Sequence, residues 1–180
     1  MTKPAIQLNE KMLSTELVSE LKLRNPHAAP RLLKITLNVG LNASNRDPKM
    51  PDVIQSVLTR ITGQKPVTAL AKKSISNFKI REGMAVGYKV TLRGKRMYDF
   101  LTKFVHIVLP RVRDFRGISP LSVDHQGKMS IGFREYISFP EIRSVVVEKL
   151  HGLEVTFTTN AGTRERGLAM FRAVGMPFTK

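Results

Sequence analysis

A two-layer α+β domain, with helices on one face of a mostly antiparallel sheet, is the fold that this sequence predicts. Several segments alternate apolar and polar residues, which is typical of strands with one buried face. Other segments repeat apolar residues at helical spacing. The predicted order β-α-β-β-α-β-β-α lacks the regular alternation of a parallel α/β fold. We therefore expect the strands to pair antiparallel and the second face of the sheet to stay open and polar.

The first predicted elements are a helix and a strand. Asn9 can cap a helix that runs to Leu23 before Pro26 stops it. The segment RLLKITLNVGL then alternates strictly, so it predicts a half-buried strand. The expected inward residues are Leu33, Ile35, Leu37, Val39 and Leu41, and the expected outward residues are Lys34, Thr36, Asn38 and Gly40.

A second helix and a long hairpin follow. Residues 51–62 have helical apolar spacing, and Gly63 suits the position just after the helix. Residues 66–71 predict a short strand, and residues 72–83 a long, basic, exposed hairpin loop. The returning strand alternates between two sets of residues. Its inward set is Val86, Tyr88, Val90 and Leu92, and its outward set is Gly87, Lys89, Thr91 and Arg93.

The remaining elements have equally clear boundaries. Residues 95–109 carry a broad apolar stripe that predicts a helix ended by Pro110. After the basic loop PRVRDFRGIS, the segment DHQG predicts a turn and GKMSIGFREYISF a strand. Residues 153–159 alternate as another strand with Leu153, Val155, Phe157 and Thr159 on one face. The last helix, with Leu168, Phe171 and Val174 in its stripe, can be capped by Thr163 or Asn160.

The composition predicts one cytoplasmic domain spanning residues 1–180. A chain of 180 residues with 42% hydrophobic content can bury a substantial core. Zero cysteines exclude disulfides and thiolate metal sites, and they fit a reducing compartment. No apolar run approaches the roughly 18 residues of a membrane span, and the N-terminal MTKPAIQLNE lacks a signal-peptide core. We expect no membrane partner.

Positive charge is concentrated in the middle of the chain. The formal net charge is +16, and residues 60–116 hold fourteen Lys or Arg against three acidic residues. Such a density repels itself unless a polyanion neutralises it, and phosphate backbones are the common polyanion. The outward strand residues put short hydrogen-bonding side chains among long cations. We expect this face to read the shape, phosphates and 2′-hydroxyls of folded RNA, with an ordinary solvated face as the alternative.

The sequence offers little to catalysis. The four histidines are far apart and lack metal-ligand spacing, so we interpret them as surface or structural residues. Phosphate-loop, dinucleotide-binding and nucleophile-elbow motifs are absent from the sequence. We interpret Gly83, Gly87 and Gly94 as turn and close-approach glycines. We expect a protein that is not an enzyme, with no catalytic residues, no metal and no cofactor.

The longest motif blocks are similar to a known family. The block GQKPVTALAKKSISNFKIREGMAVGYKVTLRGKRMYDFL, followed by PRVRDFRGIS, FPEI and MPFTK, closely resembles the bacterial form of the fifth large-subunit ribosomal protein. The resemblance covers about residue 30 to the C-terminus. It implies an α+β domain in the central protuberance of the cytoplasmic ribosome's large subunit. The implied partners are 5S rRNA, large-subunit rRNA, the P-site tRNA and neighbouring ribosomal proteins, including a small-subunit head protein.

The resemblance also implies roles for particular residues. The family's 5S rRNA-binding positions fall on Lys34, Asn38, Gln64, Phe78 and Thr91, to which the strand pattern adds Thr36, Lys89 and Arg93. The tRNA-contacting loop would present Lys72, Lys73, Ser74, Lys79 and Arg81. The intersubunit bridge would involve Arg111, Arg113 and Arg116 and the turn at Gly127. Phe78 either stacks on a base or folds back onto its own hairpin.

Two other functions remain open from the residues alone. A general RNA-binding protein or RNA chaperone would need the same chemistry without a preference for 5S rRNA. A binder of anionic membranes or acidic proteins would use the same basic patch. Such a membrane binder predicts a basic amphipathic helix, whereas much of this charge falls in loops and strands.

Overall fold

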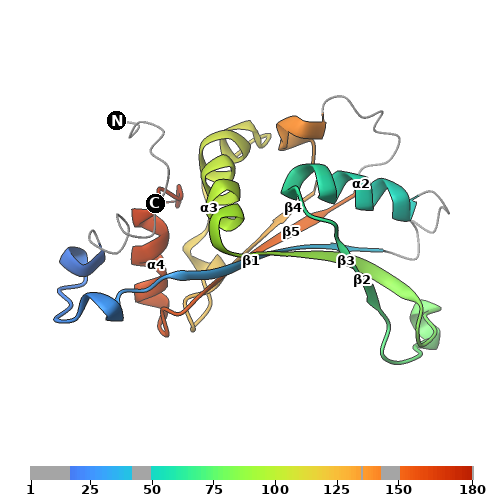
Figure 1. The fold of residues 1–180 in the computed structure, drawn as a ribbon, viewed down its shortest axis with the longest axis horizontal. Coiled ribbons are helices and arrows are strands. Elements are labelled where there is room, and N and C mark those ends of the chain that lie inside the picture. Colours follow the sequence, from blue (N-terminus) through green and yellow to red (C-terminus); the bar gives the residue numbers. More distant parts are fainter. Residues whose placement is uncertain (1–16, 42–49, 135, 143–150, 180) are drawn as a thin grey trace. The chain divides into compact units, whose positions relative to one another are not determined.

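The computed structural model describes residues 17–41, 50–134, 136–142 and 151–179. The helices and strands follow one another in the predicted order (Figure 1). They are β1 (Leu32–Gly40), α2 (Met50–Thr62), β2 (Val67–Leu70), β3 (Ala85–Leu92), α3 (Gly94–Lys103), β4 (Met129–Phe133), β5 (Leu153–Thr159) and α4 (Arg164–Ala173). The predicted α+β class is confirmed.

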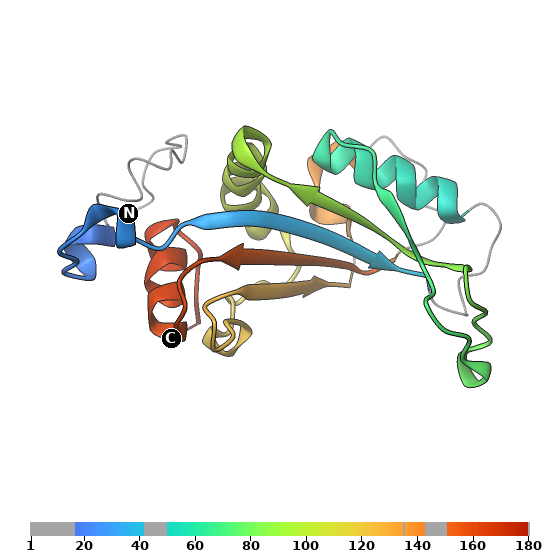
Figure 2. The same cartoon turned by 60° about the horizontal axis from the view of Figure 1, so that its bottom comes forward.

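The strands form one sheet in the order β2-β3-β1-β5-β4. Neighbouring strands run in opposite directions (Figure 2). In the β2–β3 hairpin, Val67 pairs with Lys89 and Ala69 with Gly87, and the register then shifts between Ala69 and Leu70. Such an irregularity increases the local twist of a hairpin, here just before its tip.

The chain divides into two compact units, each assembled from separate stretches of sequence. Unit 1 comprises residues 1–35, 92–131 and 156–180, and unit 2 comprises residues 36–91 and 132–155. Strands β1, β3, β4 and β5 each contribute residues to both units. The expectation of a single domain over residues 1–180 stays a prediction.

The core of unit 2 lies between its strands and α2. The helix lies along one side of β1 and β3 (Figure 1) and buries the predicted stripe, which includes Ile54, Val57, Leu58 and Ile61. Gly63 follows with φ +66°, and its N–H donates to the Thr59 carbonyl, as expected for the residue after a helix. Inward strand residues complete this core: Leu37, Val39, Tyr88, Val90, Leu153 and Val155.

Unit 1 is centred on Phe157 of β5. Its ring lies 5.3 Å from Phe104 and 6.1 Å from Phe171 of α4, so both helical segments pack on the same face of that strand. Phe104 begins a π-helical turn, Phe104–Val108, that continues α3 and is followed by a 3-10 turn, Leu109–Arg111. The predicted helix over 95–109 is therefore helical throughout but changes pitch at Phe104.

Several local predictions need correction. The first helix does not reach Leu23, because its described helical residues are 17–20 and Lys22 has φ +49°; its expected start at Asn9 lies outside the described residues. Leu33 is 41% exposed, while Leu32 is buried, so strict inward alternation begins only at Ile35.

The later boundaries also differ from the predicted ones. The strand expected over GKMSIGFREYISF ends at Phe133, and a 3-10 turn, Tyr136–Ser138, follows. Of the two candidate caps for the last helix, Thr163 is correct, since its hydroxyl accepts the Arg166 N–H at 3.4 Å. Asn160 instead accepts the Arg31 N–H through its side chain at 2.6 Å.

Candidate nucleic-acid interface

The predicted outward residues of unit 2 form a polar sheet surface, which we call the outer face: Thr36, Asn38, Lys89 and Thr91. On β1, Leu37 and Val39 are buried, whereas Thr36 is half-buried and Asn38 exposed. On β3, Lys89 is exposed and Thr91 half-buried between the inward residues Tyr88, Val90 and Leu92. The alternation in the sequence therefore predicts this face correctly over residues 36–40 and 88–92. The prediction is wrong at the start of β3, where Gly87, expected outward, is buried and Val86, expected inward, is half-buried.

A carboxylate that the sequence pattern did not select also lies on this face. The Asn38 side-chain amide donates to Oε2 of Glu154, an exposed residue of β5, at 3.4 Å. This bond fixes the Asn38 amide and leaves its Oδ1 able to accept a hydrogen bond. The outer face is thus not uniformly cationic. It combines placed donors and acceptors, which suits direct contacts to sugar and base edges better than charge neutralisation alone.

Gln64 lies beside the outer face, as its assignment to the same site requires. Its side-chain Nε2 donates to the Thr91 carbonyl at 3.3 Å, although the two residues are 27 positions apart. The buried Thr62 hydroxyl accepts the Gln64 N–H at 3.2 Å and donates to the Leu58 carbonyl at 2.7 Å. The end of α2 therefore holds Gln64 against β3.

The glycine interpretation is confirmed at three positions. A Cβ atom on Gly87 would lie 2.7 Å from the Val39 carbonyl oxygen, so β3 approaches β1 more closely than any side chain allows. Gly83 and Gly94 have φ of +79° and +57°, conformations that favour glycine.

The hairpin tip, residues 71–84, contains the predicted exposed loop over residues 72–83 and has internal structure of its own. Ala71 and Met84 are joined by a backbone hydrogen bond of 2.8 Å, and Ile75 and Ile80 exchange two, at 2.9 and 3.1 Å. A 3-10 turn, Ser76–Phe78, closes the end, with Lys79 at φ +51°. The Ser74 hydroxyl accepts the Glu82 N–H at 3.0 Å, so Ser74 has a structural bond within the tip.

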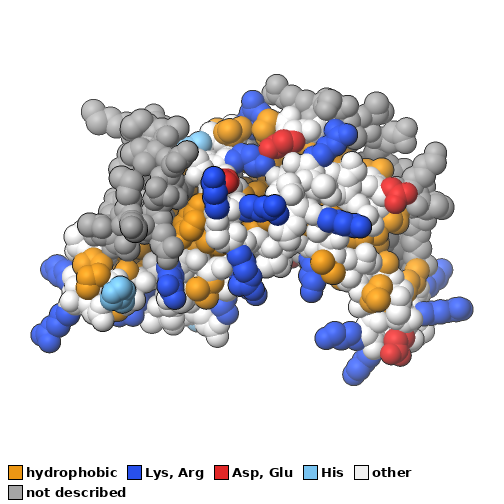
Figure 3. Space-filling model, viewed as in Figure 1, with side chains coloured by type: hydrophobic (Ala, Val, Ile, Leu, Met, Phe, Trp, Pro, Cys, Tyr) orange, Lys and Arg blue, Asp and Glu red, His pale blue; other side chains and the backbone are white. Residues whose placement is uncertain are grey.

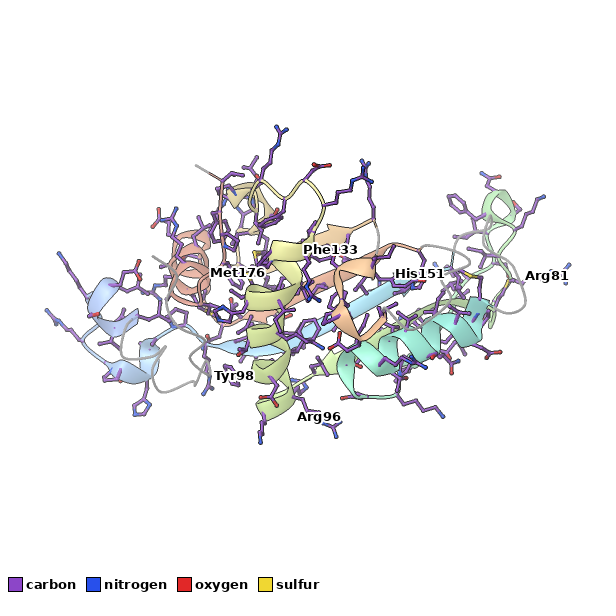
Figure 4. All side chains as sticks on the ribbon, turned by 90° about the horizontal axis from the view of Figure 1, so that it is seen from above. Arg81, Arg96, Tyr98, Phe133, His151 and Met176 are labelled. Atoms are coloured by element: carbon purple, nitrogen blue, oxygen red, sulfur yellow. The ribbon has the colours of Figure 1, made fainter. Side chains whose placement is uncertain are left out.

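The side chains of the tip are cationic and exposed. Lys72, Lys73, Lys79 and Arg81 are all exposed, with Glu82 as the acidic residue among them. Figure 3 shows this cluster at the lower right, with hydrophobic side chains between the cations, and Figure 4 places Arg81 there. The Phe78 side chain is 62% exposed, so most of its ring surface is accessible to a ligand.

Two further predicted RNA-binding residues belong to unit 1. Lys34 is half-buried on β1, in phase with Thr36 and Asn38 along that strand. Arg93 is exposed and immediately precedes α3, whose first turn contains no acidic residue. Arg96 also projects from the start of this helix (Figure 4).

The arginine loop, residues 111–117, exposes Arg111, Arg113 and Arg116. Arg113 pairs weakly with Asp114, with Nε and Oδ2 3.9 Å apart and both side chains exposed. The C-terminal segment secures the end of this loop. Ile118 donates its N–H to the Pro177 carbonyl at 2.8 Å, and its own carbonyl accepts the Thr179 N–H at 3.0 Å.

Gly127, predicted to contribute to the bridge, is buried rather than exposed. A Cβ atom on Gly167 of α4 would lie 2.5 Å from the Gly127 Cα, so the two glycines are in close contact. The Thr159 hydroxyl donates to the Gly127 carbonyl at 2.7 Å. The DHQG turn forms as predicted, with the Asp124 carboxylate accepting the N–H groups of Gln126 and Lys128. Its exposed residues are Asp124, His125 and Gln126.

The histidines are surface or structural, as the sequence indicated. His27, His106 and His125 are exposed. His151 is buried 4.2 Å from the Tyr136 ring, and neither ring nitrogen has a hydrogen-bond partner among the described residues. Burial lowers the pKa of His151 to about 4 and raises that of Tyr136. Within the described ranges, the His, Asp and Glu side chains do not gather in threes as metal ligands do.

The helices that the structure describes are too short or too polar to cross a membrane. Comparison with known proteins then identifies the class to which the chain belongs: structural proteins of the large ribosomal subunit. The family described as Ribosomal protein L5 matches residues 25–81, and the C-terminal part of the same ribosomal family matches residues 85–178. The chain belongs to the ribosomal protein L5 family, which is structural and not enzymatic.

Individual relatives agree with this family. The large ribosomal subunit protein uL5 of Halothermothrix orenii is 50% identical over 165 residues, covering 92% of each chain. The uL5 of Anaeromyxobacter sp. strain K is 50% identical over 169 residues, covering 94% of each. That of Heliobacterium modesticaldum is 51% identical over 155 residues, covering 86% of each. The protein is thus a constituent of the cytoplasmic ribosome that takes part in translation.

Proposed function

We propose that this protein binds 5S rRNA in the central protuberance through the outer face of unit 2. The observation that carries the proposal is the joint placement of Asn38, Gln64 and Thr91. Asn38 is oriented by Glu154, and Gln64 is bonded to the Thr91 carbonyl. Three short polar groups far apart in sequence are therefore held on one sheet surface, and the family resemblance assigns 5S rRNA to these same positions.

The chemistry of this surface suits folded RNA. The wide, shallow minor groove of A-form RNA displays 2′-hydroxyls and base edges, which both donate and accept hydrogen bonds. Amide and hydroxyl side chains on a sheet can meet these groups at fixed spacing. Lys89, exposed between Tyr88 and Val90, can neutralise a neighbouring phosphate.

The hairpin tip and the arginine loop would serve two other contacts. The four exposed cations of the tip would hold the P-site tRNA. Phe78, which the resemblance assigns to 5S rRNA, is exposed enough to stack on a base of that RNA. Arg111, Arg113 and Arg116 would meet a protein of the small-subunit head. The remaining cations of the chain favour contacts with large-subunit rRNA.

General RNA binding is the second candidate, because the tip and the basic surface attract any polyanion. The acid on the outer face argues against it. Glu154 repels phosphates indiscriminately, so a surface selected only for charge would not place it on β5, directly beside the RNA-facing strand β1. A membrane-binding role is less favoured, since the apolar stripes of α2 and α3 are buried in the protein.

A salt titration tests the proposal. Binding of 5S rRNA and of a length-matched folded RNA would be measured by filter binding over a range of salt concentrations. With roughly five to eight phosphate contacts, the log–log slope should be about −4 to −6. We expect the preference for 5S rRNA to persist at high salt, because hydrogen bonds to sugar and base edges are screened little. Equal affinity for both RNAs at high salt would favour general binding instead.

A further inference from the structure

Leu121 has the most exposed side chain among the large hydrophobic residues that the structure describes. It is 79% exposed and sits in a 3-10 turn, Pro120–Ser122, that directly follows the arginine loop in unit 1. Isolated apolar residues are common on protein surfaces and need no explanation by themselves. What distinguishes Leu121 is that the structure holds its backbone in place from several directions.

The constraints on this turn are specific. The Ser119 hydroxyl accepts the Leu121 N–H at 3.3 Å, and Pro120 fixes its own φ at the start of the turn. Arg164 of α4 donates from Nη2 to the Pro120 carbonyl at 2.9 Å. A mobile apolar side chain loses conformational entropy when it binds, whereas one on a fixed backbone loses less.

Both ends of the turn are also tied to other segments. Before it, Ile118 pairs in parallel with Phe178 of the C-terminal segment, and after it, Val123 forms an isolated bridge with Met129. Phe178 is half-buried, as is Phe115 in the arginine loop. Leu121 is therefore the most exposed member of an apolar set carried by the arginine loop, the turn and the segment bridged to it.

The cations of the arginine loop are of one kind. The arginine loop contains three Arg and no Lys, whereas the hairpin tip contains three Lys and one Arg. Protein interfaces are enriched in Arg and aromatic residues and depleted in Lys. RNA would use the cations, but a branched aliphatic side chain has no π face on which a base can stack. The composition of the arginine loop thus favours a protein over a nucleic acid as the partner.

We propose that Leu121 is the apolar anchor of a protein–protein contact, and that its partner offers an apolar pocket rimmed by Asp and Glu. This inference rests on the proposed function, because the partner would be met on the ribosome. It adds to that function a contact residue outside the positions assigned so far. The arginines would attract the Asp and Glu side chains around the partner's pocket. Burying the Leu121 side chain in that pocket would remove its apolar surface from water.

Photo-crosslinking can test the anchor. The chain would carry p-benzoyl-phenylalanine in place of Leu121, and a matched chain would carry it in place of Ile107, another exposed hydrophobic residue of unit 1. Incorporation into large subunits is measured first by sedimentation, and intact ribosomes are then irradiated. We expect the 121 chain to form a cross-link that survives ribonuclease and is destroyed by protease. The 107 chain should not form the same product.

A second variant tests the acidic rim. Arg113→Gln combined with Arg116→Gln should lower the yield of the 121 cross-link about threefold or more at low salt, and salt should reduce the difference. A cross-link that ribonuclease destroys, or none from an incorporated chain, would overturn the inference. Loss of 5S rRNA affinity is measured separately on the free protein. Failure of the 5S rRNA proposal is therefore distinguishable from failure of this one.

Discussion

The outer face and the hairpin tip belong to the same unit, and strand β3 leads from the tip into the outer face, yet the two regions are built in different ways. On the outer face, short side chains are oriented by neighbours, as Asn38 is by Glu154 and Gln64 by the Thr91 carbonyl. At the tip, backbone hydrogen bonds fix the chain while the long cationic side chains remain exposed. Recognition by hydrogen bonds needs fixed side chains, whereas phosphate binding needs only a fixed backbone that presents charge.

The largest effect is expected when the positive charge of the tip is removed. Replacing Lys72, Lys73, Lys79 and Arg81 together with Gln should leave the fold and most 5S rRNA affinity intact but abolish the contribution of the tip to tRNA binding. If all four cations contact phosphates of the tRNA, the magnitude of the log–log salt slope for tRNA binding should fall by about 3 in the variant. At 0.1 M salt this corresponds to an affinity about a thousandfold lower. Retention of P-site tRNA on ribosomes carrying the variant measures this.

The fold must be checked in the same variant. Thermal melting should change little, because the variant keeps the backbone hydrogen bonds of the tip and the bond between Ser74 and Glu82. A collapsed melt would mean that the cations are structural. Normal tRNA retention with an intact melt would show that the tip does not hold tRNA.

The second prediction concerns the core of unit 2, on which the outer face depends. His151 is neutral in the folded state because burial lowers its pKa to about 4, while the unfolded chain takes up a proton near pH 6.5. Stability is therefore complete above about pH 6.5 and declines as the pH falls towards 4. The free energy of unfolding should be lower than at pH 7 by about 2 kcal/mol at pH 5 and by about 3 kcal/mol near pH 4.

Urea unfolding at pH 7 and pH 5 checks this decline. His151→Phe removes the titration and two unpartnered ring nitrogens, so its stability should change less between the two pH values. His125→Gln is the matched control, since it removes an exposed histidine of unit 1. If the wild type and His151→Phe lose equal stability, another group controls the acid response.

Sequence alone predicted the order of elements because each strand and helix carries its own period. The alternation over residues 35–39 and 88–92 identified the buried side of β1 and β3 from local pattern, and burial agrees. Leu33 was misassigned because a run of two leucines fits either phase, and only packing decides between Leu32 and Leu33. The π-helical turn at Phe104 leaves the apolar stripe unchanged, so the pattern could not reveal it.

Only part of the candidate site could be predicted from the sequence. Strand alternation selects Asn38 and Thr91, but Glu154 is 116 residues from Asn38, and its place depends on β5 pairing beside β1. Internal order in the tip was missed because Ile75 and Ile80 pair across a turn too short and polar to show strand periodicity. The burial of Gly127 could not be predicted from the turn motif, because its contact with Gly167 is between residues far apart in sequence.

The third prediction tests recognition on the outer face. Asn38→Ala and Thr91→Ala should each weaken 5S rRNA binding by about 1 to 3 kcal/mol if a buried RNA partner is left unpaired. Thr59→Ala is a matched control, because Thr59 is exposed on α2 and its hydroxyl donates to the Gln55 carbonyl of the same helix. Affinity would be measured by calorimetry at high salt. Equal losses in all three variants would refute the assignment of the outer face.

The smallest expected effect concerns the carboxylate on the outer face. Glu154→Gln keeps a side-chain oxygen that can accept the Asn38 amide, so the orientation of Asn38 survives while one negative charge is lost. A carboxylate near RNA repels phosphate, and at surface exposure this costs roughly 0.2 to 1 kcal/mol. The variant should bind 5S rRNA up to about fivefold more tightly at low salt, and the gain should vanish at high salt. It should also bind unrelated folded RNA more tightly, because charge does not discriminate between sequences. A loss of 5S rRNA affinity would mean instead that the carboxylate accepts a hydrogen bond from the RNA, as a 2′-hydroxyl or a base amino group can donate. A gain in 5S rRNA affinity therefore indicates a residue that only orients Asn38, and a loss indicates one that contacts the RNA itself.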